Sequence, residues 1–170
     1  MTIRSMLDDL QLSAITAASG GGLLQLREAQ EQLINDLGTD AVGPVLMLAA
    51  QTIALRDIVD RAMAARSAMY IALDTVLHLD PDRRDRTAAR AANVIAAVRL
   101  AVQEPSAENR WEVEAHTDTL VGVLSAGGDA TGPVRTLVAS ARVCADVEMA
   151  EDTTRRNVAE LRIEIEGIGS

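Results

Sequence analysis

Hydrophobic positions recur three or four residues apart along most of this 170-residue chain, which is the period of a helix buried on one face. The longest uninterrupted pattern covers residues 44–78 and is bounded by Gly43-Pro44 and Asp80-Pro81. One apolar stripe within it steps by three and four residues without exception: Leu55, Ile58, Ala62, Ala65, Met69, Ala72 and Val76. The spacing predicts one long helix with a buried seam.

The same spacing predicts five further helices, separated by glycine and proline breaks. The six predicted helices span residues 2–18, 23–37, 44–78, 81–103, 107–126 and 133–166. Asp80 is the expected N-cap ahead of Pro81, and Gly38 is the expected C-cap of the second helix. We therefore expect an all-α fold, an elongated six-helix bundle whose longest helix extends about 52 Å at roughly 1.5 Å per residue.

Two stretches that open the long helices resemble one another. When residues 38–50 are laid over residues 127–139, eight of the 13 positions are identical. The same offset places a short-short-long order of helices over a second one, which indicates a tandem duplication with pseudo-repeats 1–79 and 80–170 inside a single helical domain, 1–170. Convergence is the alternative, because Asp, Gly and Pro are favoured at any helix start.

Composition limits the class of protein. Hydrophobic residues make up 48% of the chain but aromatic residues only 1%, so the core must be built from aliphatic side chains and alanine. The net charge of −9 disfavours nucleic acid as a partner. The longest apolar run, residues 41–50, is too short to span a bilayer, no export signal is recognisable, and the single Cys144 fits a reducing compartment. These features predict an acidic, soluble, cytoplasmic protein without a membrane partner.

Only two histidines are available for chemistry, and each follows a carboxylate by one helical turn. The pairs are Asp74 with His78 and Glu112 with His116, and together they could bind a metal ion if the two halves packed face to face. The simpler interpretation is that His78 offsets the helix dipole beside Asp74 and that His116 lies on a core face. We expect no metal site, no cofactor and no catalytic residue.

A basic stripe, formed by Arg83, Arg86 and Arg90, is the most concentrated positive charge in the sequence. It indicates either a solvated face paired with Asp80, Asp82 and Asp85 or a contact for an anion or an acidic partner. Glycines 20–22 suggest a phosphate loop only superficially, because the spacing and the lysine of such a loop are missing, and a flexible turn is expected.

The functional hypothesis is a non-catalytic module that binds protein, most simply itself, as a homodimer or higher homo-oligomer. A second apolar stripe on the helix over 44–78 is wider than one neighbour can bury, so the interface is expected near Met63, Met69, Tyr70 and Leu73. The alternatives are a small-ligand sensor or carrier with a pocket between the two halves and a metal-dependent enzyme using the histidine pairs.

Overall fold

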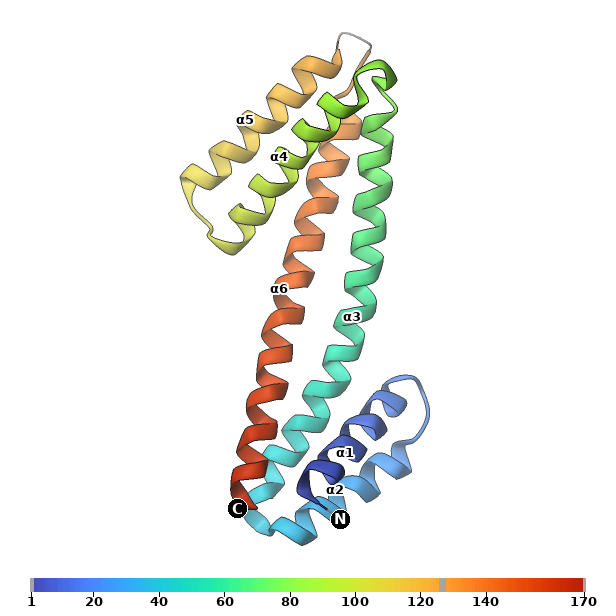
Figure 1. Ribbon diagram of the computed structural model, residues 1–170, viewed down its shortest axis with the longest axis vertical. Helices are drawn as coiled ribbons and strands as arrows, with labels where there is room; N and C mark the ends of the chain where they lie inside the picture. The colour runs from blue at the N-terminus through green and yellow to red at the C-terminus, as the bar shows by residue number, and fades with distance from the viewer. Residues whose placement is uncertain (1, 126–127, 170) are drawn as a thin grey trace. The chain divides into compact units, whose positions relative to one another are not determined.

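The computed structural model describes residues 2–125 and 128–169, and within them it contains six α-helices and no strand, as predicted (Figure 1). The helices are α1 (Ile3–Ala18), α2 (Leu23–Leu37), α3 (Val42–Leu77), α4 (Arg84–Gln103), α5 (Ala107–Leu124) and α6 (Thr131–Ile168). Short 3₁₀ turns, η1 (Thr39–Ala41) and η2 (Pro81–Arg83), precede α3 and α4. The all-α prediction is confirmed.

The helix ends follow the local chemistry of the sequence at most positions. Thr2 caps α1 by accepting a hydrogen bond from the Ser5 amide, and Ser106 caps α5 by accepting one from the Asn109 amide. Gly38 ends α2 with a φ of 89°, a left-handed value that favours glycine. The capping residues therefore account for where these helices begin and end.

Asp80 is the exception. Its side chain makes no capping hydrogen bond, because Pro81 opens a 3₁₀ turn and α4 itself begins only at Arg84. Asp80 therefore stands in the N-cap position of η2, ahead of Pro81, but it does not cap α4 as predicted. The last predicted residue of the fifth helix, Ala126, and the first residue of the second repeated stretch, Gly127, lie outside the described residues.

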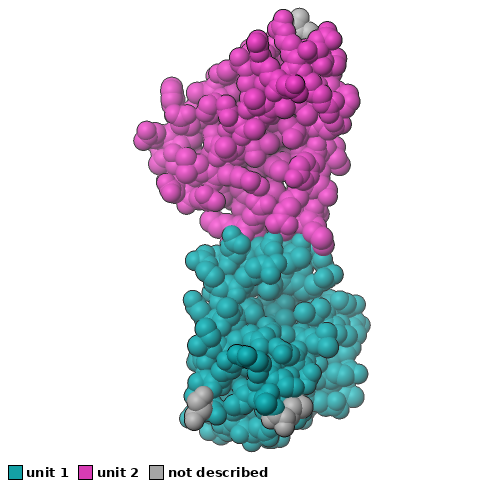
Figure 2. Space-filling view, viewed as in Figure 1, with its two compact units in different colours: residues 1–60, 150–170 teal, residues 61–149 magenta. Residues whose placement is uncertain are grey.

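The chain divides into two compact units (Figure 2). Unit 1 contains residues 1–60 and 150–170, and unit 2 contains residues 61–149. Each unit therefore combines one short hairpin, α1–α2 or α4–α5, with part of α3 and part of α6. These boundaries differ from the predicted pseudo-repeats, which place each long helix whole in one half of the sequence.

Each unit has its own core drawn from four helical segments. In unit 1 the hydrophobic core cluster consists of Met6, Leu7, Leu10, Ala14, Leu26, Leu33, Ala41, Val45, Leu48, Ala49, Val158 and Ile165. In unit 2 it consists of Ala65, Met69, Ala72, Val76, Ala91, Val94, Ala97, Val98, Val113, Leu120, Leu124, Ala130, Val134, Leu137, Ala141 and Cys144. Both cores lack aromatic residues and combine alanine with branched side chains, which lets helices approach closely.

Burial follows corresponding positions in the two halves of the sequence. When a position of α3 is buried, the position 89 residues later in α6 is usually buried too. Val45 and Val134 are one such pair, and Leu48 and Leu137 are another. In the hairpins the spacing differs: the buried residues of α1 and α4 correspond at 84 residues and those of α2 and α5 at 87. The spacing changes twice, first because α4 and α5 are longer than α1 and α2 and then because the connection before α6 is longer than the one before α3, so one offset aligns the long helices but not the short ones. The duplication itself stays a prediction.

We expect the two cores to be equally sensitive to cavities. Leu48→Ala and Leu137→Ala each remove a fully buried leucine side chain, so each should lower the free energy of unfolding by about 2.5–5 kcal/mol. Leu12→Ala, at an exposed position of α1, should change it by less than about 0.5 kcal/mol. Urea unfolding followed by circular dichroism measures all three; a buried variant as stable as Leu12→Ala would contradict the assigned core.

Candidate functional site

The four predicted interface residues on α3 do not share one environment. Met63 and Tyr70 are 52% and 63% exposed, whereas Met69 is 6% exposed and lies in the core of unit 2. Leu73 is half-buried against the same core. Only Met63 and Tyr70 remain available on the surface of this chain, and the neighbouring Ile71 is also exposed there.

The two histidine pairs form, but they do not meet. The Nδ1 atom of His78 lies 3.3 Å from a carboxylate oxygen of Asp74, and the Nε2 atom of His116 lies 3.5 Å from one of Glu112. Asp74 also pairs with Arg84, at 3.4 Å. In the described part of the chain, no group of three or more His, Cys, Asp and Glu side chains is close enough to hold a metal ion. The pairs thus stay separate: Asp74 and His78 lie at the end of α3 and in the turn after it, and Glu112 and His116 lie within α5.

The basic stripe, which runs from Arg83 of η2 into α4, lies among carboxylates. A surface depression at the start of this helix is lined by Pro81, Asp82, Arg83, Arg84, Asp85 and Arg86, so both signs of charge alternate around it. Arg83 and Arg86 are exposed, and Arg90 is half-buried. This arrangement matches the expectation of a solvated face with mixed charge better than that of an anion site.

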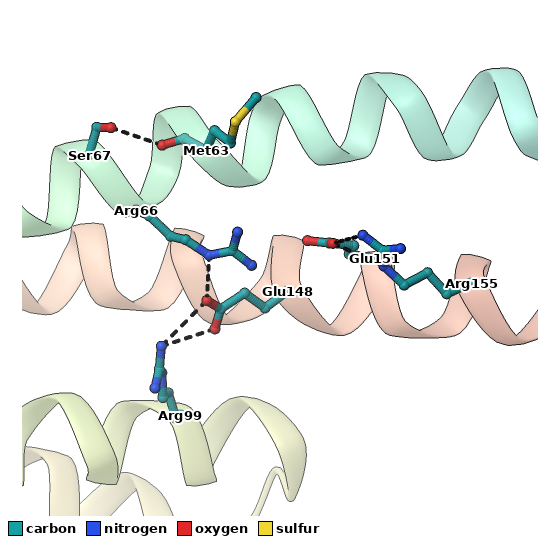
Figure 3. Close-up of polar contacts among 7 residues, drawn as sticks. All are labelled: Met63, Arg66, Ser67, Arg99, Glu148, Glu151 and Arg155. Carbon is teal, nitrogen blue, oxygen red and sulfur yellow. Dashed lines mark hydrogen bonds and ion pairs between the residues drawn. The ribbon is translucent and has the colours of Figure 1, made fainter. Parts of the chain in front are cut away.

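A cluster of three charged side chains joins three helices inside unit 2 (Figure 3). Glu148 of α6 accepts a hydrogen bond from Nε of Arg66 on α3, at 3.0 Å, and one from Nη2 of Arg99 on α4, at 3.1 Å. Because the carboxylate is half-buried, two guanidinium partners compensate its loss of water. The cluster fixes the position of the three helices relative to one another within this unit.

Cys144 lies one turn before Glu148 and is fully buried. Burial raises the pKa of the Cys144 thiol, the Glu148 carboxylate raises it further, and Arg99 lowers it in part. The thiol is therefore neutral near pH 7, and a neutral thiol is a poor nucleophile and a poor metal ligand. The Glu148 cluster and its cysteine stabilise the unit and supply no reactive group.

The Glu148 cluster was not predicted from the sequence. Arg66 and Arg99 are 82 and 49 residues from Glu148, so no helical spacing connects them. Each arginine taken alone resembles the many solvated arginines of this chain. Only the packing of the three helices brings the charges together.

The first half of α3 has an apolar surface as well as an apolar core face. No charged residue occurs from Val42 to Leu55, yet Leu46, Met47, Ala50 and Ala54 are exposed. Among the described helices, the one covering 39–77 is long and apolar enough to cross a membrane, and only 28% of its most apolar 18-residue window is buried. This helix therefore carries more apolar surface than its own chain covers.

No protein-family model matches the chain, and neither the curated proteins nor the solved structures contain one that is significantly similar. The function is therefore inferred from the surfaces and side chains of this chain alone.

The Glu148 cluster makes a testable contribution to stability. Glu148→Gln leaves Arg66 and Arg99 facing each other without the negative charge between them, so it should lower the free energy of unfolding by about 1–3 kcal/mol. Asp60→Asn removes the exposed pair with Arg56, whose charged atoms lie 3.3 Å apart, and should cost less than about 0.5 kcal/mol. Equal effects in chemical denaturation would show that the cluster is no stronger than a surface pair.

Proposed function

We propose that the chain is a non-catalytic helical module that acts by binding protein, and specifically by associating with copies of itself. The supporting observation is the exposed apolar surface of α3, which includes Met63, Tyr70 and Ile71 in unit 2. Met63 and Tyr70 are seven residues apart and therefore lie on one side of the helix. Methionine and tyrosine are enriched at protein interfaces, and grouped apolar residues on an otherwise charged surface mark such contacts.

The chemistry of the described residues supports a non-catalytic role. The thiol of Cys144 is buried and neutral, and each histidine pairs with the carboxylate four residues before it, His78 at an exposed position and His116 at a half-buried one. The charges of the Glu148 cluster are already paired with one another. A nucleophile, a base and a stabilising group would have to converge for catalysis, and these groups do not.

Two alternative functions, a ligand sensor or carrier and a metal-dependent enzyme, can each be tested by a different measurement. A ligand sensor or carrier would retain a small molecule through purification, which native mass spectrometry detects as an added mass. A metal-dependent enzyme would hold a stoichiometric metal ion, which elemental analysis of the purified protein detects. Either result would replace the self-association proposal as the primary function.

Self-association should be visible at tens of micromolar protein by size-exclusion chromatography with light scattering. In unit 2, Met63→Glu combined with Tyr70→Glu should lower the average mass, because two carboxylates would have to be desolvated in an interface. The matched control is Leu24→Glu, a charge at an exposed leucine of α2, which should leave the mass unchanged. A wild-type protein that is monomeric under these conditions would refute the proposed function.

The histidines offer a further test of the non-catalytic proposal. The double variant His78→Gln and His116→Gln should keep the wild-type helicity, oligomeric state and partner binding, since both side chains are at least partly exposed and each pairs with the carboxylate four residues before it. Circular dichroism and light scattering report the first two properties. A folded double variant that loses association or binding would assign the histidines a functional role.

A further inference from the structure

Each compact unit takes its helices from both halves of the sequence. We call residues 1–79 the N-half and residues 80–170 the C-half. Unit 1 combines the hairpin of the N-half, α1–α2, and the start of α3 with residues 150–168 of α6. Unit 2 combines the hairpin of the C-half, α4–α5, and the start of α6 with residues 61–77 of α3. Each half therefore supplies the last part of its long helix to a core that is otherwise built from the other half.

Both cores are incomplete without these contributions. In unit 1 the C-half supplies Val158 and Ile165, which are 8% and 0% exposed. In unit 2 the N-half supplies a row of four residues of α3, each at most 8% exposed: Ala65, Met69, Ala72 and Val76. Because each core needs side chains from both halves, neither half can bury its own hairpin fully when it is separated from the other.

Polar side chains also connect the two halves. In unit 1, Arg162 of the C-half donates to Asp8 of the N-half at 2.8 Å and to the side-chain oxygen of Gln11. In unit 2, Arg66 of the N-half donates to Glu148 of the C-half at 3.0 Å. Arg162, Arg66 and Glu148 are all half-buried, so each of these charges depends on its partner in the other half.

The positions in unit 2 that correspond to the Arg162 contact are apolar. Arg162 corresponds to Leu73 at the spacing of 89 residues that relates the long helices. Gln11 corresponds to Ile95 at the spacing of 84 residues that relates α1 and α4. Leu73 and Ile95 are both half-buried against the core of unit 2. Unit 1 thus has two polar side chains at positions where unit 2 has two apolar ones.

The Glu148 cluster shows the same relation in the opposite direction. Glu148 corresponds to Val59 at the spacing of 89 residues, and Arg99 corresponds to Ile15 at the spacing of 84. Unit 2 therefore has a carboxylate that binds Arg66 and Arg99 where unit 1 has two aliphatic side chains. Each unit has its own polar contact between helices, and the two contacts lie at positions that do not correspond.

We propose that the N-half and the C-half are selective binding partners, each of which binds the other in preference to a second copy of itself. A pair of C-halves would place Arg162 near Ile95. A pair of N-halves would place Arg66 near Val59, without a carboxylate. Both mismatches leave a half-buried charge without its partner, which is unfavourable, whereas the mixed pair satisfies both charges. The apolar cores supply the affinity of the halves for each other, and these polar contacts supply the selectivity.

The first experiment cuts the folded chain between its halves. A protease site inserted between Leu79 and Asp80, in the turn between α3 and η2, permits cleavage after folding. The cut protein should keep the helicity of the intact chain, and the two fragments should elute together in size-exclusion chromatography. Fragments that elute separately at tens of micromolar would overturn the inference.

The second experiment tests the selectivity. The cut protein is unfolded in urea, refolded by dilution and studied by native mass spectrometry. Complexes that contain the two fragments in equal numbers should dominate, whether the intact chain is a monomer or an oligomer, so the result is independent of the proposed self-association. Pairs of like fragments as frequent as random pairing gives would overturn the selectivity.

A single substitution tests the role of Arg162 in this selectivity. Arg162→Leu should raise the share of complexes that contain two C-halves, because a leucine suits Ile95 as Leu73 does. The matched control is Arg156→Leu, since Arg156 is an exposed arginine of α6 whose contact with Asp152 lies within its own helix. Equal shares in the two variants would overturn the role assigned to Arg162.

The third experiment tests the surface that holds the halves together. Ile165 is completely buried in the core of unit 1, whereas Ile163, in the same helix, is 70% exposed. Ile165→Ala should raise the dissociation constant of the cut protein by about 30-fold or more, and Ile163→Ala should change it by less than about twofold. Helicity measured by circular dichroism during serial dilution gives both constants. Equal constants for the two variants would overturn the assigned surface.

Discussion

The burial of one apolar stripe along each long helix is the constraint on which both units depend. The stripe begins at Ala41 of η1 and continues along α3 through Val45, Leu48, Thr52, Leu55, Ile58, Ala62, Ala65, Met69, Ala72 and Val76. The positions 89 residues later, from Ala130 to Ile165, repeat the same steps and are buried or half-buried, Glu151 and Thr154 among them. The average step is 3.5 residues, as in helices that wind around a neighbour. Two consecutive steps of three, at Thr52–Leu55–Ile58 in α3 and Ala141–Cys144–Val147 in α6, shift each stripe around its helix.

Alanine determines how these cores are packed. The chain contains no phenylalanine, so most side chains on the packing faces of the helices are small. Leu48 and Leu137 are among the few large side chains that are fully buried. Close contacts between helices compensate for the small buried area of each alanine, but they require other interactions that hold the helices at that distance. In unit 2 the Glu148 cluster supplies such a restraint between α3, α4 and α6. In unit 1, Arg162 of α6 pairs with Asp8 of α1 at 2.8 Å and also contacts Gln11.

The sequence predicted the helices well because their signals are local. The bounds of α2, the cap at Gly38 and the helical state of the chain's end all follow from residues within a few positions of each other. The prediction that Asp80 caps the fourth helix failed because Pro81 is equally compatible with a 3₁₀ turn, which here precedes the helix. The two units could not be read from the sequence, because they depend on which part of α6 packs with which hairpin. The contacts of Glu148 could not be predicted either, because they also depend on how distant helices pack.

The spacing of apolar residues alone also could not predict which apolar positions of α3 are buried and which are exposed. Ala49 is buried while Ala50 is exposed, and Met69 is buried while Tyr70 is exposed, although each pair is adjacent and apolar. Whether a position on α3 is buried depends on where the hairpin of its unit lies against the helix, since each hairpin covers one stripe of residues and leaves the next stripe exposed. An apolar stripe wide enough for two neighbours thus predicts that a second neighbour exists. It leaves open which stripe the chain buries itself, and the structure resolves that choice by exposing the face that carries Gly43, Ala50 and Ala54.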